Sequence, residues 1–303
     1  MIVIGSRGSQ LALWQAHHIQ ACLQALGAET RIEIIKTSGD RIQDVPLAKV
    51  GGKGLFTKEI EEALLDRSID LAVHSMKDVP TDLPDGLIIS AIPEREEPRD
   101  ALIGSRVDQL RAGMRVGTSS LRRSSQLMLL ARGLKIDLKI EMLRGNVDTR
   151  LRKLDEGQYD AIVLAAAGLR RLGWENRITD LIPPEIMCPA VGQGALAIET
   201  RDDGGPAQHL ARQLDHAASR SAVTAERALL RVLGGGCQVP VGAHASVTPG
   251  TVQLTAIVAH PDGSHVVRGQ LSGSDPEQVG ATLGRTLLDQ GAREILREVY
   301  SAQ

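Results

Sequence analysis

The residue of this sequence best placed for chemistry is Cys237, which lies in a segment cleared of bulky side chains. Glycines occupy positions 234 to 236 before it, and Pro240 and Gly242 follow it. A loop without bulky side chains lets a large molecule approach the sulfur atom, whereas a cysteine buried in a core needs no such space. The alternative is a glycine-rich turn in which the cysteine is incidental, because thiol reactivity depends on surroundings that spacing does not show.

A second candidate is a set of arginines near the ends of predicted strands and the starts of predicted helices. Ligands of open α/β sheets bind beyond the carboxyl ends of the strands, and helix N-termini favour anions there. Cations in the first turn of a helix interact unfavourably with the helix dipole. Several arginines at such positions therefore indicate an anionic ligand with several carboxylates or phosphates. Singly, each arginine could instead be a solvated surface residue. The set is Arg7, Arg122, Arg123, Arg144, Arg150 and Arg171.

Asp78 stands at the polar tip of the apolar stretch Leu71–Ser75, beside Lys77. One interpretation is a carboxylate that caps a turn. The other is a functional carboxylate, kept ionised by neighbouring arginines, that stabilises a developing cation or relays protons. Lys49 and Lys53 lie in a glycine-rich, charged stretch, 37–53, which predicts a long mobile loop. They are either solvated or the cations of a lid over an anionic ligand.

His244 follows Cys237 by seven residues, which leaves a Cys–His nucleophile pair open, although a lone histidine is more often structural. The eight histidines show no metal-ligand spacing, so no metal site is expected.

The elements that must position these side chains alternate between strand and helix over the first two thirds of the chain. This pattern predicts two α/β units with mainly parallel sheets covered on both faces. The first unit has strands at 2–5, 32–35 and 71–75 and helices at 9–27 and 55–65. The second has strands at 115–117, 139–143 and 161–165 and helices at 118–130 and 147–155. The segment after Pro189 is expected to return to the first unit.

The pattern changes after residue 217, where a helix over 223–233 precedes the Cys237 loop. Strands at 252–258 and 266–271 flank the turn 261–264, and a helical region covers 276–298. The predicted fold is therefore α/β, with two α/β domains and a third small α+β domain that carries Cys237. The expected boundaries are 1–95 plus 194–214, 96–193, and 215–303.

The composition narrows the class of partner. The chain has 303 residues, a net charge of −2 and only 2% aromatic residues, which disfavours a stacking surface for nucleic acid. No stretch approaches the roughly 18 apolar residues of a membrane span, and no leader is evident. Three scattered cysteines suit a reducing compartment, so a cytoplasmic protein without nucleic-acid or membrane partners is expected.

Seven motifs in order make the chain resemble the porphobilinogen deaminase family over nearly its whole length. The resemblance implies a fold with two domains like those of periplasmic binding proteins and a cleft between them. The motifs are Ser6–Gln15, Gly51–Phe56, Val73–Pro80, Gly117–Arg123, Leu143–Leu151, Pro189–Gly194 and Gly235–Pro240.

The resemblance further implies a dipyrromethane cofactor joined to Cys237 through a thioether. Four porphobilinogen units would be added to it with loss of ammonia, and hydrolysis would release hydroxymethylbilane. It also implies a monomer and a hand-over of the product to uroporphyrinogen III synthase.

Site residues follow from the same resemblance. Asp78 matches the catalytic carboxylate that stabilises a cationic azafulvene. The positions that match cofactor-binding residues are Ser9, Lys77, Ser120, Arg122, Arg123, Arg144 and Arg150, and those that match substrate-binding residues are Arg7, Arg171, Lys49, Lys53 and Gln193.

The sequence departs from the familiar family pattern in two places. The stretch 124–143 is a few residues longer, and the added residues, around 129–134, are expected to extend a helix or loop away from the cleft. Position 170 is Arg where Lys is familiar. Two other functions stay open: an anion-binding protein of the periplasmic type, and a hydrolase that uses Cys237 and His244.

Overall fold

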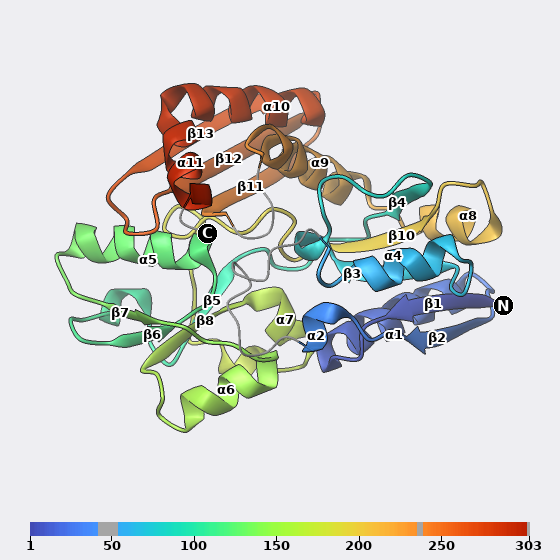
Figure 1. Cartoon of the computed structure of the whole chain (residues 1–303), viewed down its shortest axis with the longest axis horizontal. Coiled ribbons are helices and arrows are strands. Elements are labelled where there is room, and N and C mark those ends of the chain that lie inside the picture. Colours follow the sequence, from blue (N-terminus) through green and yellow to red (C-terminus); the bar gives the residue numbers. More distant parts are fainter. Residues whose placement is uncertain (42–53, 235–238, 302–303) are drawn as a thin grey trace. The chain divides into compact units, whose positions relative to one another are not determined.

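A computed structural model describes residues 1–41, 54–234 and 239–301 of the chain. These residues divide into two compact units. The first comprises 1–41, 54–96 and 194–220, and the second comprises 97–193 with 221–234 and 239–301. Three sheets organise them, one in the first unit and two in the second (Figure 1). The predicted division into three domains, with its boundaries, stays a prediction.

The first sheet has the strand order β2-β1-β3-β10-β4, with every strand parallel except β10. β10 pairs antiparallel with both β3 and β4, so the chain after Pro189 does return to this sheet. The strands are β1 (Ile2–Ser6), β2 (Thr30–Ile34), β3 (Leu71–Ser75), β4 (Leu87–Ala91) and β10 (Leu196–Arg201).

Helices cover both faces of the first sheet, because alternate residues of β3 face opposite sides. Leu71 and Val73 pack with α1 (Gln10–Ala25), whereas Ala72 packs with α4 (Lys58–Leu65). The Ser9 hydroxyl caps α1 by accepting a hydrogen bond from the Ala12 N–H, and Gly27, at φ +84°, follows its end. The predicted start and stop of this helix are confirmed.

The second sheet repeats the same arrangement, in the order β7-β6-β8-β5-β9, with β5 antiparallel to its two neighbours. The prediction of two mainly parallel sheets is therefore confirmed. The strands are β5 (Asp100–Ile103), β6 (Arg115–Gly117), β7 (Lys139–Glu141), β8 (Ala161–Ala165) and β9 (Asp180–Leu181), and the helices are α5 (Leu121–Leu134), α6 (Val147–Asp155) and α7 (Ala166–Arg171).

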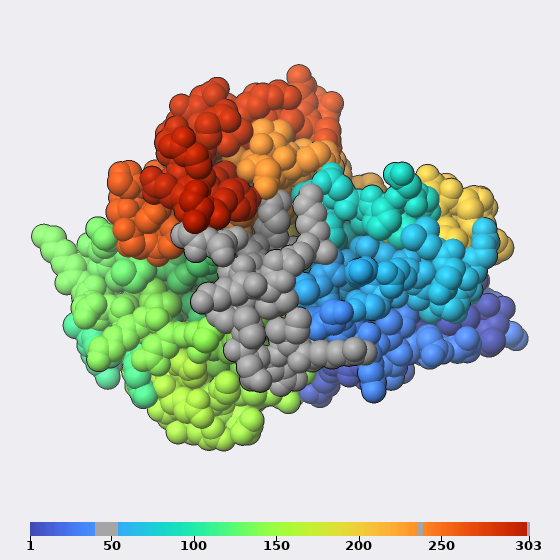
Figure 2. Space-filling view, viewed as in Figure 1, coloured from blue at the N-terminus to red at the C-terminus, as the bar shows by residue number. Residues whose placement is uncertain are grey.

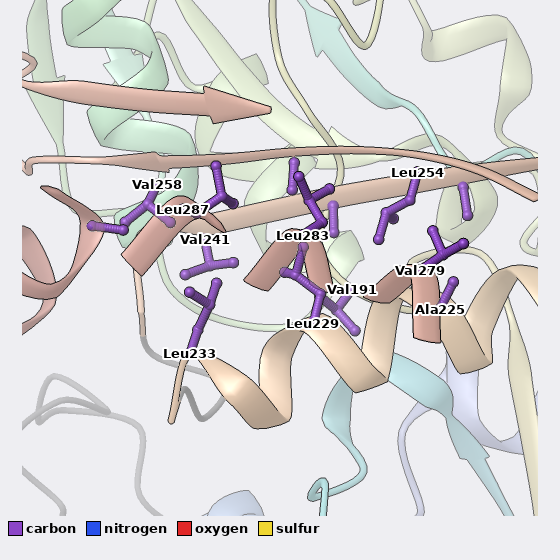
Figure 3. Packing of buried hydrophobic residues seen from close by; sticks show 14 of the residues in the cluster. Val191, Ala225, Leu229, Leu233, Val241, Leu254, Val258, Val279, Leu283 and Leu287 are labelled. Carbon is purple, nitrogen blue, oxygen red and sulfur yellow. The ribbon is translucent and has the colours of Figure 1, made fainter. Parts of the chain in front are cut away.

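The third sheet is antiparallel, with β11 (Val241–Thr248), β12 (Thr251–Ala259) and β13 (Val266–Gly273). The helices α9 (Ala217–Val232) and α10 (Pro276–Leu287) contribute Leu229, Leu283 and Leu287 to a shared apolar core with the sheet (Figure 3). In the space-filling view the orange-to-red residues of β12, β13, α10 and α11 (Arg293–Ser301) gather into one continuous body (Figure 2).

Several elements differ from the sequence prediction. The strands β4, β5, β9, β10 and β11 were not predicted, and a helical turn, α2 (Ser38–Arg41), begins the stretch expected to be a loop. The last helical region is interrupted at Leu288–Ala292, where Gly291 has φ +110°. The remaining short elements are α8 (Pro206–Arg212) and 3-10 turns at Met76–Asp78, Val107–Gln109 and Glu175–Arg177.

α5 continues to Leu134, four residues beyond the predicted end of this helix, and residues 129–134 are helical. That these residues are added relative to the family, and point away from the cleft, stays a prediction. Leu129 packs against Ile257 and Ala259 of β12, and the Arg132 Nε donates to the carbonyl oxygen of Asp262 at 3.1 Å. Within the second unit the extension therefore supports the β12–β13 hairpin.

Candidate functional site

A small pocket, about 70 Å³ in volume, lies at the carboxyl ends of β1 and β3 in the first unit. This is the sheet edge at which α/β proteins bind ligands. Its lining comes from three stretches of the chain, 7–15, 56–57 and 73–78, and brings together the predicted residues Arg7, Ser9 and Asp78. Gln15, Thr57, His74 and Ser75 complete the polar lining.

Short local contacts hold Asp78 at this edge. β3 ends at Ser75, and the chain then turns through the 3-10 helix Met76–Asp78. The Val79 N–H closes this turn by donating a hydrogen bond to the Met76 carbonyl oxygen at 3.1 Å. The Gln15 side chain of α1 donates to the Ser75 hydroxyl at 2.9 Å. Asp78 and Lys77 are half-buried. The carboxylate thus lies on a fixed turn that opens into the pocket.

Arg7 brings a cation and an aromatic ring to the same pocket. Its guanidinium lies over the ring of Phe56, the sequence's single phenylalanine, at 4.2 Å from the ring centroid. A carboxylate, a guanidinium, three hydroxyls and an aromatic face can together hold a small heterocycle that carries acidic substituents. The same carboxylate can stabilise positive charge that develops on such a molecule.

A buried ion cluster lies in the second unit, where Asp100 joins two of the predicted arginines. Arg122 Nη1 lies 2.6 Å from Asp100 Oδ2, and Arg123 Nη2 lies 2.7 Å from Asp100 Oδ1. Arg122 also donates to the Cys188 carbonyl oxygen at 2.7 Å and Arg123 to that of Val163 at 3.0 Å. All three charged side chains are at most 7% exposed.

Opposing effects set the charge of this cluster. Burial alone would raise the pKa of Asp100, but the two guanidinium groups outweigh it and lower the pKa to about 2. Two cations then face one carboxylate, so the cluster keeps a surplus positive charge. The sequence predicted ligand-facing arginines; the structure shows that Arg122 and Arg123 are also committed to an internal carboxylate.

Asp100 was missed by the sequence reasoning. The available signal was a charged residue at the first position of the apolar strand Asp100–Ile103, because an aspartate that opens a fully buried strand needs a buried cation. Gln193, predicted to bind substrate, belongs to the same cluster. Its Nε2 donates to Asp100 Oδ1 at 3.1 Å and to the Pro98 carbonyl oxygen at 2.7 Å.

The other predicted arginines lie elsewhere in the second unit. Arg144 and Arg150 are half-buried on either side of Gly145, whose φ is +112° and whose carbonyl oxygen accepts from Arg150 Nε at 2.8 Å. Arg171 is buried at the last residue of α7. Ser120 is the N-cap of α5, and its hydroxyl accepts from the Arg123 N–H.

Three predicted residues, Cys237, Lys49 and Lys53, lie outside the described residues. Cys188 does not resemble a reactive thiol, because burial raises its pKa to about 12. His244 is in β11. Within the described parts of the chain, no group of acidic, histidine and cysteine side chains has the geometry of a metal site. No helix there is long and apolar enough to cross a membrane.

Comparison with solved structures gives remote similarities. A periplasmic substrate-binding protein of an ABC transporter from Coxiella burnetii is 14% identical, with a TM-score of 0.42 over 72% of this chain and 93% of that one. YehZ from Escherichia coli is 12% identical, with a TM-score of 0.41 over 78% of this chain and 94% of that one.

Comparison with protein families and curated sequences gives close matches. The model "Porphobilinogen deaminase, dipyromethane cofactor binding domain" matches residues 2–209, and "Porphobilinogen deaminase, C-terminal domain" matches residues 221–289. A protein from Syntrophobacter fumaroxidans named porphobilinogen deaminase is 53% identical, over 100% of this chain and 99% of that relative. The chain therefore belongs to the porphobilinogen deaminase family.

Proposed function

We propose that this chain joins four porphobilinogen units head to tail on a dipyrromethane held by Cys237, with loss of ammonia at each addition, and releases hydroxymethylbilane by hydrolysis. Membership of the family supports the reaction class. The observation that supports the residue assignment is the pocket that gathers Asp78, Arg7 and Ser9 at one sheet edge.

The charges of the described residues suit a dipyrromethane, whose pyrroles bear acetate and propionate groups. The cluster of Arg122, Arg123 and Asp100 has surplus positive charge, and Arg7 brings a further cation to the Asp78 pocket. Ser9, Lys77, Ser120, Arg144 and Arg150 are the further residues that would hold the cofactor. When bound, the cofactor supplies the pyrrole carbon to which the first unit is joined.

Asp78 has the central chemical role in this proposal. Loss of ammonia leaves positive charge on the substrate pyrrole, and a fixed carboxylate beside that pyrrole stabilises the charge. Arg7 binds an acidic substituent of the substrate and so orients the ring over Asp78. Arg171, Gln193, Lys49 and Lys53 are proposed as further substrate contacts.

The experiment combines intact mass with turnover. The active protein is expected to be heavier than its sequence by one dipyrromethane, and Asp78→Asn should keep that mass while kcat falls at least a hundredfold. Asp85→Asn, an exposed carboxylate seven residues further on, is the matched control and should keep normal turnover. An active protein of unmodified mass would refute the cofactor and reopen a Cys237–His244 hydrolase.

The partners and compartment are also proposed. A cytoplasmic monomer that passes its product to uroporphyrinogen III synthase suits the composition, which disfavours nucleic-acid and membrane partners. Light scattering at several concentrations checks the monomer, and coupled turnover with the synthase, with and without a trap for free hydroxymethylbilane, checks the hand-over.

A further inference from the structure

Behind the Asp78 pocket, the first unit buries a group of ionisable side chains that the proposed function does not use. His74 of β3 and Glu199 of β10 face the same side of the sheet, and His74 Nε2 lies 2.9 Å from Glu199 Oε2. Glu61 lies one helical turn into α4, which packs on both strands. The exposed fractions are 5% for His74, 0% for Glu199 and 8% for Glu61.

The polar atoms of this group are incompletely paired among the described residues. Glu61 Oε1, Glu199 Oε1 and the Thr57 hydroxyl are buried and make no hydrogen bond with any residue in the described ranges. Thr57 is the N-cap residue of α4 and makes no capping bond with its side chain. Two buried carboxylates near a single histidine, which among the described residues is bonded to Glu199 alone, are costly when both are charged, so the geometry favours an additional proton among them.

The electrostatics agree with this geometry. Burial raises the pKa of Glu61; the nearby Thr57 hydroxyl opposes the rise, although its geometry falls short of a hydrogen bond. The charge of Glu199 adds to the rise, that of His74 opposes it, and Glu62 adds to it from the exposed face of the helix. A raised carboxyl pKa means that the proton is retained to higher pH.

The group also has a connection to the substrate pocket. Thr57 and His74 both line the pocket that contains Asp78, whereas Glu61 and Glu199 lie behind them. We propose that Glu61, Glu199 and His74 hold one exchangeable proton in the wall of this pocket, and that His74 passes it to and from the groups that react there. The claim that His74 exchanges the proton with reacting groups rests on the proposed function. The claim that the three side chains hold a proton does not.

The proposed reaction has a use for such a site. Joining two pyrrole units breaks one C–N bond and forms one C–C bond. The attacking carbon gives up its proton, and the ammonia that leaves with the C–N electron pair takes up a proton to become ammonium, so the charges balance. Asp78 is assigned to stabilise the cation, and a second acceptor at His74 can store the proton between the two events.

Infrared spectroscopy of the cofactor-loaded protein tests the held proton directly. The wild type is expected to show the carbonyl stretching band of a buried protonated carboxyl near neutral pH. Glu61→Gln should remove the band, and Glu199→Gln should remove or shift it. Glu62→Gln, at the exposed neighbouring position of the same helix, should keep the band and only slightly lower the pH at which it disappears, because the Glu62 charge contributes to the raised pKa of Glu61.

Turnover of the same variants tests the exchange. Glu61→Gln and Glu199→Gln should keep the cofactor mass and change KM less than about twofold, while kcat falls about tenfold or more and its pH profile shifts. If one variant fails to fold, the other carries the test. If the wild type lacks the band, or if the band persists in both variants, the proposal that this group holds a proton is wrong. If the band is lost but kcat is unchanged, the proposal that this proton is exchanged during the reaction is wrong. A wild type inactive with porphobilinogen would refute the proposed function and leave the infrared result standing.

Discussion

At the scale of single residues, the arginines of this chain serve two purposes that their spacing alone does not separate. Arg122 and Arg123 are buried against Asp100, whereas Arg144 and Arg150 are half-buried around a glycine turn. Substitution in the first pair should therefore lower stability as well as cofactor binding, whereas substitution in the second pair should affect mainly ligand binding.

For Arg144→Leu we expect weaker binding of the carboxylate-rich chain that grows on the cofactor, because a charge-assisted contact is lost, and the substrate dependence should change with it. KM should rise about tenfold with a smaller change in kcat. Arg152→Leu, which removes an exposed arginine paired with Glu156, is the control and should leave both constants unchanged. Equal effects of the two variants on KM would contradict the role of Arg144.

For Asp100→Asn we expect a large loss of stability, because two buried guanidinium groups lose their counter-charge. The free energy of unfolding should fall by roughly 3–5 kcal/mol, as measured by urea denaturation. Asp108→Asn, whose side chain is 72% exposed, should change it by less than about 0.5 kcal/mol. A stable Asp100→Asn protein would show that the cluster has other counter-ions.

The same carboxylate predicts a dependence of stability on pH. Its folded pKa, about 2, lies below the ordinary value of 3.8, so its contribution is complete above the ordinary value and is lost as the pH falls through the folded one. The contribution is on the order of 2 kcal/mol. Unfolding measured at about pH 5 and about pH 3 should show a steeper loss for the wild type than for Asp100→Asn.

These residues also show what the sequence could predict. Arg7, Ser9 and Asp78 were assigned to one site, and the structure brings them together, because strand ends of a parallel sheet converge on one edge. Asp100, His74, Glu61 and Glu199 were not found, since their roles depend on burial by strands far apart in sequence. Local spacing carries no record of such contacts.

At the scale of elements, close packing of α9 and α10 depends on glycine. A Cβ on Gly280 would overlap the carbonyl oxygen of Ala225, and one on Gly284 would lie 2.9 Å from the Cβ of Val232. The two helices therefore approach each other over glycine backbone beside the Leu229–Leu283 core (Figure 3).

Gly280→Ala should force these helices apart. We expect the free energy of unfolding to fall by about 1–3 kcal/mol in a denaturant titration. Gly133→Ala is the matched control, because it lies in α5 with no atom within 4 Å of the new Cβ, and it should stabilise slightly. Similar effects of both substitutions would exclude close packing as the cause.

Strand prediction succeeded for β3 and β8 but missed five strands, among them the two-residue β9 and the eight-residue β11. β3 and β8 are continuous buried stretches and were predicted at their observed bounds. β9 has two residues, and β10 follows a glycine-rich turn, so neither has a local signal that distinguishes it from loop. Their pairing partners, supplied by distant parts of the chain, decide their structure.

At the scale of the whole molecule, the proposed thioether at Cys237 would link the cofactor, and with it the proposed activity, to the chain. Cys237→Ser should yield a protein whose intact mass equals its sequence and which turns over no porphobilinogen, because the thioether cannot form. Cys22→Ser, at the half-buried cysteine of α1, should keep both cofactor and turnover. Normal turnover by Cys237→Ser would overturn the attachment site.

The position of β10 imposes an order in which the two sheets can fold during synthesis. All strands of the second sheet lie between residues 100 and 181, so that sheet can form as soon as this segment has left the ribosome. The first sheet cannot join β4 to β3 until Arg201 has emerged, because β10 lies between these strands and pairs with both. Consider ribosome-bound chains that are halted so that residues 1–193, but not β10, have left the exit tunnel. In these chains we expect segment 97–193 to resist proteases while segment 1–96 is still digested. Equal protection of both segments would show that the first unit can form without its returning strand.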